Sequence, residues 1–255
     1  MDLRLLEGHA VALLLHLLRT GAFLAVVPLF GRQRDTFFLR LVLSVALASI
    51  SWWTAKRAVA VPADLLQLGV LGARECLVGF ALGFAVSLLT AVLVAAGEIV
   101  SSEMGFSMAR VMNPESGVDA TVVSQLFQVF GFLLILHFDL HHEVLRILDH
   151  TFTACPVGGP FAIAPIWDGV RVLVGASIVV ALQYAFPVLA VMLLLTVGFV
   201  LLGRAVPHVN LMEFSFTARV LVALGAATWF LSAGAPFLLR SFARMLDGVR
   251  AMFPG

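Results

Sequence analysis

The chain has 255 residues, of which 61% are hydrophobic and only 12% are charged, and its formal net charge is +1. Soluble domains carry roughly a quarter charged residues, so this composition excludes an ordinary soluble domain and predicts a membrane protein. A net charge this close to zero also excludes a strongly basic nucleic-acid-binding protein.

Six apolar segments follow one another along the chain, each near the roughly 20 residues that cross a bilayer core. They are approximately Ala10–Phe30, Phe37–Trp53, Cys76–Ala96, Val122–Phe138, Val172–Leu202 and Val220–Leu239. No small-residue cleavage site follows the first segment, so we expect it to be a retained helix. No internal repeat separates the segments, and residues 1–255 are therefore expected to form one all-α membrane domain.

The first apolar segment contains Arg19, and a cation in hydrocarbon is costly unless it snorkels or finds a partner. Glu75 and Glu98 bracket the third segment and are the candidate partners. Two alternatives stay open for Arg19: a snorkelling side chain in a tilted helix, and a buried ion pair between subunits.

The third segment extends backwards to Asp64, which suits an N-cap, so one long helix from Asp64 to about Ser102 is predicted. Gly79 and Gly83 on this helix have the GxxxG spacing that allows helix backbones to pack closely.

A polar stretch, Gly97–Asp119, follows this helix and interrupts the apolar pattern. It carries three methionines, Met104, Met108 and Met112. In a helix this spacing places all three on one face, and flexible methionine side chains close around a variable object better than rigid ones do. Gly105 and the pair Asn113-Pro114 break regular structure on either side. The stretch is interpreted either as a gate or as a short helix that packs its methionines against the bundle.

The segment from residue 137 to residue 150 is rich in histidine and acidic residues. His137 and His141 are four residues apart, a spacing that suits a metal on one helix, but HExxH is not formed and no second ligand cluster exists. An apolar stripe at helical spacing, Leu140, Val144, Leu148 and Phe152, instead predicts an amphipathic interfacial helix with a histidine edge. We therefore expect no metal here.

The fifth apolar segment is too long for one straight span. Pro187 near its middle predicts a kinked helix or two half-helices. The whole chain lacks a phosphate-binding loop, a GxSxG elbow and a paired-carboxylate arrangement, so we expect neither an enzyme nor a bound cofactor.

Taken in order, the motifs resemble the FliR family of flagellar biosynthetic proteins and its injectisome counterparts. The matching positions are Arg19, Pro28-Leu29-Phe30, Arg40, Arg74-Glu75, Gly79, Gly83, Ala96-Gly97-Glu98, Met104-Gly105, Asn113-Pro114, His141-His142, Phe186-Pro187-Val188-Leu189, Gly198, Arg204-Ala205, Pro207 and Asn210. The chain departs from the family pattern mildly, for example with Asn113 where aspartate is usual and His208 where glutamine is common.

The resemblance implies a subunit of a type III protein-export gate in the bacterial inner membrane, at the flagellar basal body or a secretion apparatus. Its implied partners are several copies of FliP-like and FliQ-like subunits, a FlhB-like subunit and unfolded export substrates. These subunits wind into a helical, cone-like assembly around a channel.

The resemblance further implies that a loop matching Met104–Gly117 plugs this channel. On this view Phe106, Met108 and Met112 form the apolar seal. Gly105, Pro114 and Gly117 act as hinge points beside Asn113. Polar contacts of Glu98, Arg110, Glu115 and Asp119 hold the closed state. Structural or intersubunit roles fall to Arg19, Pro28, Glu75, Gly79, Gly97, Glu98, Pro187, Arg204, Pro207 and Asn210.

Three other functions are considered beside the gate. A stand-alone secondary transporter would line its substrate site with the broken fifth segment and Arg19. An intramembrane metalloenzyme would use His137, His141 and Glu143. A scaffold that nucleates partner subunits is compatible with the gate.

Overall fold

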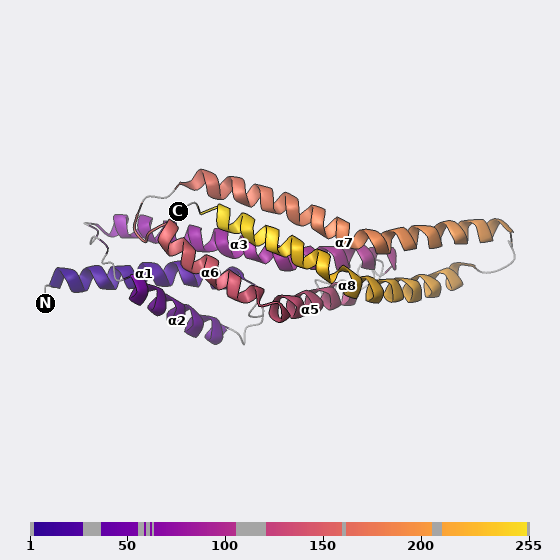
Figure 1. Cartoon of the computed structure of the whole chain (residues 1–255), viewed down its shortest axis with the longest axis horizontal. Coiled ribbons are helices and arrows are strands. Elements are labelled where there is room, and N and C mark those ends of the chain that lie inside the picture. Colours follow the sequence, from indigo (N-terminus) through magenta and orange to yellow (C-terminus); the bar gives the residue numbers. More distant parts are fainter. Residues whose placement is uncertain are drawn as a thin grey trace. The chain divides into compact units, whose positions relative to one another are not determined.

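The structure is a computed structural model that describes residues 3–27, 37–55, 59, 62, 64–105, 121–159, 162–205 and 211–253. Within these residues it contains seven α-helices and no strand (Figure 1), which confirms the all-α prediction. The helices are α1 (Leu3–Val26), α2 (Phe37–Ala55), α3 (Leu65–Glu103), α5 (Val122–His137), α6 (Leu140–Ala154), α7 (Ile163–Ala205) and α8 (Leu211–Ala251).

Five of the described helices, α1, α2, α3, α7 and α8, are long and apolar enough to cross a membrane. The pair α5 and α6 meets the same criterion together but bends by 72° at its break, which makes six spans if the pair counts as one. The six apolar segments therefore correspond to six helical regions. The predicted long third helix is confirmed, because α3 starts one residue after Asp64 and ends at Glu103.

The break between α5 and α6 lies at Phe138 and Asp139. Asp139 has φ 55°, a left-handed conformation that a helix interior does not accommodate. Aspartate and asparagine tolerate this conformation better than most residues do, so the sequence can turn there without glycine.

Helix α7 continues through Pro187 as one 43-residue helix, so the alternative of two half-helices is wrong. Proline removes the bond that its own N–H would donate to the carbonyl of Gln183, but the apolar turns on both sides keep their bonds. Helix α8 likewise contains Pro236 in its interior.

The chain divides into two compact units. The first unit comprises Met1–Leu88, Asp139–Val174 and Arg244–Gly255, and the second comprises Leu89–Phe138 and Gly175–Ala243. Helices α3, α7 and α8 contribute residues to both units.

In the first unit, α1 and α2 form a hairpin. The Thr20 hydroxyl on α1 donates to the carbonyl of Ser44 on α2 at 3.2 Å. The apolar side of α6, with Val144, Ile147 and Leu148, is buried, which confirms the predicted amphipathic helix.

In the second unit, the last part of α3 packs against α5, where Leu93 of α3 lies against Gly131. Tyr184 of α7 packs its ring beside Gly234 of α8 and donates from its hydroxyl to the carbonyl of Leu231 at 3.3 Å. This donation satisfies a phenol that is only 6% exposed in an apolar core.

Candidate functional site

The predicted gate begins at the end of α3, where Met104 and Gly105 follow Glu103. Met104 is fully buried and its N–H donates to the carbonyl of Val100 at 3.2 Å. Gly105 has φ 86° and its N–H donates to the carbonyl of Ser102 at 3.1 Å. A glycine in the left-handed region is the usual end of an α-helix. Gly105 therefore ends α3 and sets the direction in which the chain leaves it.

Beyond the predicted gate, Thr121 is held by Glu98 on α3. Its Oε1 atom accepts from the backbone N–H of Thr121 at 3.0 Å and from the hydroxyl of Ser124 at 2.7 Å. Thr121 is the N-cap of α5, and its side chain accepts from the N–H of Ser124. Hydrogen bonds to an ionised carboxylate are stronger than neutral ones, so Glu98 fixes the start of α5 to α3.

Gly97 allows this contact because it has no side chain. A Cβ atom placed there would lie 2.5 Å from the Cα atom of Ser124. The two helix backbones therefore approach each other more closely than any other residue type permits.

The described residues that flank residues 106–120, Gly105 and Thr121, are thus both held at the end of α3. Glu98 and Gly105 are seven residues apart, which is about 10 Å along the helix axis at 1.5 Å per residue. Residues 106–120 connect the two ends. The remaining predicted gate residues, Phe106, Met108, Arg110, Met112, Asn113, Pro114, Glu115, Gly117 and Asp119, lie outside the described residues.

The Arg19 guanidinium is buried in the first unit and pairs with Glu75. Its Nη2 atom lies 2.6 Å from the Glu75 Oε2 atom, and its Nε atom donates to the same oxygen at 2.6 Å. The two side chains are 2% and 5% exposed. The ion pair therefore lies within the chain, which is neither the snorkelling side chain nor the intersubunit pair that the sequence left open.

The rest of the guanidinium binds α6 and the turn that follows it. Nη1 donates to the carbonyl and hydroxyl oxygens of Thr151 at 2.8 and 3.5 Å, and Nη2 donates to the carbonyl of Cys155 at 2.9 Å. The guanidinium carbon also lies 4.7 Å from the centroid of the Phe152 ring. Each of the three guanidinium nitrogens has an acceptor, as a buried cation requires if it is to be tolerated.

Glu75 also reaches this turn. Its Oε1 atom accepts from the N–H of Gly158 at 3.1 Å, and Gly158 has φ 75°. We call the set Arg19, Glu75, Thr151, Cys155 and Gly158 the buried polar cluster. It joins α1, α3, α6 and the turn after α6, and it places two charges where α1 and α3 meet.

The predicted close contact of Gly79 and Gly83 is present between α3 and α1. A Cβ atom at Gly79 would overlap the Arg19 carbonyl oxygen, and one at Gly83 would lie 2.7 Å from the Phe23 carbonyl oxygen. The GxxxG pair therefore lets α1 approach α3 closely enough for Arg19 to reach Glu75.

We expect Gly79→Ala to destabilise the chain by about 1–3 kcal/mol, because the added methyl group forces α1 away from α3. The matched control is Gly69→Ala on the same helix, where a Cβ atom meets nothing within 4 Å. That control should be neutral or stabilising by up to about 1 kcal/mol, since alanine favours the helix. Unfolding of the detergent-solubilised chain measures both, and equal stabilities of the two variants would contradict the close contact.

The remaining residues predicted to have structural or intersubunit roles are not part of the buried polar cluster. Pro187 lies inside α7, and Arg204 is exposed in the last turn of that helix, where a cation is favourable for the helix dipole. Pro28, Pro207 and Asn210 lie outside the described residues.

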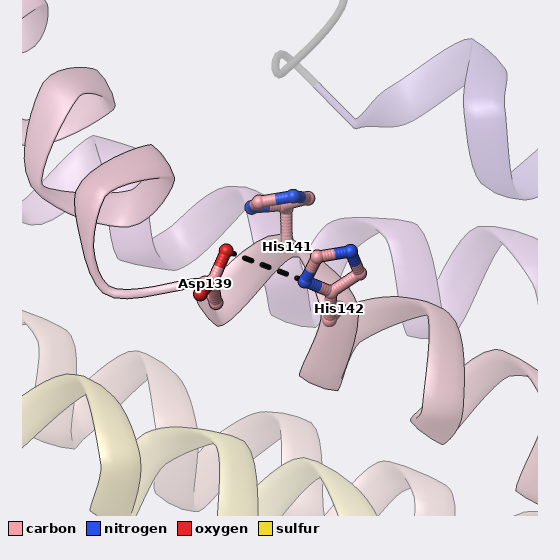
Figure 2. A group of neighbouring side chains, drawn as sticks. All are labelled: Asp139, His141 and His142. Carbon is pink, nitrogen blue, oxygen red and sulfur yellow. Dashed lines mark ion pairs between the residues drawn. The ribbon is translucent and has the colours of Figure 1, made fainter.

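The spacing argument for a metal between His137 and His141 assumes one continuous helix. His137 instead ends α5, and His141 lies in α6, beyond the break at Phe138 and Asp139. Figure 2 shows instead Asp139, His141 and His142 at the start of α6, where the Asp139 carboxylate lies 3.4 Å from His142 Nδ1. The ligand atoms of the three residues lie within 4.8 Å of one another. A helix N-terminus favours a nearby carboxylate, so Asp139 suits the start of α6.

Sequence reasoning did not find Thr151, Cys155 and Gly158 as partners of Arg19 and Glu75. Thr151 and Cys155 contribute backbone carbonyl groups, and Gly158 contributes an N–H group. Backbone groups leave no side-chain signature, and the only clue was the turn-forming sequence Pro156–Pro160.

Comparison with known proteins agrees with the resemblance. The family described as "Bacterial export proteins, family 1" matches residues 10–247. The chain is 26% identical over 217 residues to "Flagellar biosynthetic protein FliR" of Bacillus subtilis (strain 168), covering 83% of this chain and 82% of that protein. It is 26% identical over 233 residues to the protein of the same name from Caulobacter vibrioides, covering 90% and 92%.

A relative with a different name is also similar to the chain. "Surface presentation of antigens protein SpaR" of Shigella flexneri is 26% identical over 153 residues, covering 59% of this chain and 58% of that protein. Because the family match spans nearly the whole chain, the chain belongs to the bacterial export proteins of family 1.

Proposed function

We propose that the chain is a non-enzymatic subunit of a type III protein-export gate, serves flagellar assembly in the bacterial inner membrane, and lines and plugs the channel for unfolded export substrates. Two relatives that match more than four fifths of it are named as flagellar biosynthetic proteins. The segment Met104–Gly117 is the plug of this proposal.

The observation that carries the proposal is the exposed apolar surface of α7. Large apolar side chains that are more than two fifths exposed run from Ile163 to Leu202. This stretch is about 58 Å long measured along the helix, roughly twice the 30 Å thickness of a bilayer core. One lipid crossing covers about half of it, so the remaining apolar surface needs protein to cover it.

Such a cover is what neighbouring helical subunits supply. We propose FliP-like and FliQ-like subunits, and a FlhB-like subunit, as the partners. Association by packing of exposed apolar helices needs no metal, cofactor or nucleotide, and it agrees with a role in completing and closing a ring of helices.

The held ends of residues 106–120 support the plug. A segment whose two ends are fixed to one helix can move its middle without disturbing the helices that carry it. The left-handed Gly105 at one end supplies a flexible exit from α3, and the Glu98 contact closes the other end.

The Glu98 contact itself can be tested. We expect Glu98→Ala to raise amide hydrogen exchange at Thr121 by about tenfold or more, because the N–H loses a bond to a charged acceptor. The matched control is Glu103→Ala, an exposed acidic residue on the last turn of the same helix. Exchange rates read by mass spectrometry should separate the two variants, and unchanged exchange at Thr121 in Glu98→Ala would show that Glu98 does not hold this end.

The stand-alone transporter is disfavoured by two observations. Its broken fifth helix is not found, because α7 continues through Pro187. Its embedded cation is also already bound, because each guanidinium nitrogen of Arg19 has an acceptor inside the chain.

Gentle purification of the tagged chain from its host, followed by mass determination of the intact particle, tests the proposed function. We expect a large particle that contains several copies of two small helical proteins. A lone monomer or homodimer that performs ion-coupled uptake after reconstitution would overturn the proposal in favour of a transporter.

A further inference from the structure

A half-open cavity of about 400 Å³ lies in the first unit, lined by α1, α2, α6 and the turn after α6. It borders the buried polar cluster through Phe152, whose ring packs against the Arg19 guanidinium. Among the residues that the structure describes, its polar lining consists of five side chains: His16, Ser51, Thr54, Asp149 and Thr153. The predicted plug, which is carried by the second unit, does not include this cavity.

His16 is the most buried of these five polar residues and is only 3% exposed. Its Nδ1 atom lies 2.7 Å from the carbonyl oxygen of Ala12, which only accepts hydrogen bonds. In the neutral ring this bond places the proton on Nδ1 and leaves Nε2 as an acceptor. Among the described residues, the buried Nε2 atom has no hydrogen-bond partner. A buried polar atom without a partner is costly, so a donor that reaches Nε2 is favoured.

The three hydroxyl groups of the cavity already donate hydrogen bonds to backbone carbonyl groups. Ser51 donates to the carbonyl of Ala48 at 3.1 Å, Thr54 donates to the carbonyl of Ser51 at 2.9 Å, and Thr153 donates to the carbonyl of His150 at 2.8 Å. Each hydroxyl has one proton and two lone pairs, so toward the cavity these groups are acceptors.

Asp149 completes the lining with a carboxylate, which accepts only. The residue is exposed, so its side chain lies at the mouth of the cavity. The polar side chains of the cavity are therefore all acceptors, and one of them carries a negative charge. A ligand that matches this lining carries several N–H donors and a positive charge.

We propose that the cavity binds the ammonium or guanidinium group of a basic side chain from another subunit of the assembly. The partner rests on the proposed function, whereas the chemistry of the ligand rests on the lining alone. The volume suits one long side chain, and the apolar walls formed by Ala55, Phe152 and Pro156 suit its methylene stem.

An amine-bearing lipid head group fits this lining less well. Its phosphate group lies within a few bonds of the amine and needs donors of its own. The polar side chains of the cavity offer none, and Asp149 repels the phosphate at the mouth. The acceptor-only lining therefore favours a basic side chain over a zwitterionic lipid.

The ligand chemistry is tested by titrating the full chain, purified in detergent and labelled with ¹⁵N-histidine, with n-butylguanidinium. We expect the Nε2 resonance of His16, assigned from its loss in His16→Gln, to shift saturably. Asp149→Asn should weaken binding by about tenfold or more, because it removes the negative charge, and Thr153→Val should weaken it severalfold, because it removes an acceptor. The matched controls are Asp168→Asn and Thr228→Val, which change an exposed carboxylate and an exposed hydroxyl outside the cavity and should bind normally.

Three outcomes of this titration would overturn the proposal. An equal shift with uncharged butyramide would show a pocket for apolar stems alone. Binding of O-phosphoethanolamine as tight as that of n-butylguanidinium would assign the cavity to lipid. A shift that occurs only in Lys56→Gln/Arg57→Gln, which removes the two cations that follow Ala55 in the sequence, would assign it to the chain's own side chains.

The source of the ligand is tested in the assembled particle with a photo-crosslinking residue in place of Val157, an apolar residue of the lining. We expect a crosslink to a peptide of another subunit next to a lysine or arginine, and its loss in Asp149→Asn. Crosslinks confined to this chain would overturn the intersubunit partner. If no particle forms but n-butylguanidinium still binds, the proposed function fails while the ligand chemistry stands, so the two failures are distinguishable.

Discussion

Replacement of residues 107–119 by a four-residue Gly-Ser linker is expected to leave the gate assembled and to make the membrane leaky to small ions. Thr121 after this segment binds Glu98, which lies about 10 Å from Gly105 along α3. Four linker residues together with Phe106 and Ala120 span up to about 20 Å, so the Gly105 end and the Glu98 contact are preserved. The change therefore removes the proposed seal and keeps the helices that carry it.

The leak is measured as conductance of the reconstituted particle and as growth sensitivity of the host to external ions. The control keeps the length of the segment and replaces Met108 and Met112 by leucine, which preserves an apolar seal and should stay closed. Normal ion tightness of an assembled particle that carries the short linker would rule out the plug.

Substitution of Arg19 by methionine is expected to have the largest effect on stability. It leaves the Glu75 carboxylate 5% exposed and without its cation, and it removes the donors to Thr151 and Cys155. Loss of one partner of a buried ion pair costs about 3–5 kcal/mol, because the remaining charge stays desolvated. We therefore expect little folded chain to accumulate in the membrane.

A double-mutant cycle separates the charge from the packing. The variant Arg19→Met/Glu75→Met should be more stable than Arg19→Met, because it removes the unpaired carboxylate. The exposed pair of Arg171 and Asp168, 3.8 Å apart, provides the control, and Arg171→Met should change stability by less than about 1 kcal/mol. Strictly additive effects of the two substitutions would show that Arg19 and Glu75 do not stabilise each other.

The long helices and their packing followed from the sequence because apolar periodicity and small residues act locally. Helix α3 from Leu65 to Glu103 and the close approach at Gly79 are examples. The amphipathic α6 was predictable for the same reason, since its apolar stripe repeats at helical spacing.

The partners of Arg19 were not predictable in full. Glu75 was a candidate because a buried cation needs a carboxylate, but Glu98 was an equal candidate by sequence. The structure shows Glu98 instead at the start of α5, where it binds backbone and hydroxyl groups. Which carboxylate meets which donor depends on the register between helices that are far apart in the sequence.

The continuity of α7 through Pro187 was also not predictable. A proline in a helix interior destabilises the helix, whereas the apolar turns on both sides of Pro187 stabilise it. The sequence alone does not say which of the two free-energy contributions is larger. The predicted plug remains a prediction at Phe106, Met108 and Met112, which lie outside the described residues.

The most direct test of the account places a photo-crosslinking residue at Met112 in the assembled gate and stalls an export substrate in transit. We expect Met112 to crosslink to the stalled substrate, and the same residue at Trp229, which is 73% exposed on α8, to crosslink to lipid or to a partner subunit. If the substrate is trapped in the particle and Met112 never crosslinks to it, the segment does not lie in the channel and the gate proposal is wrong.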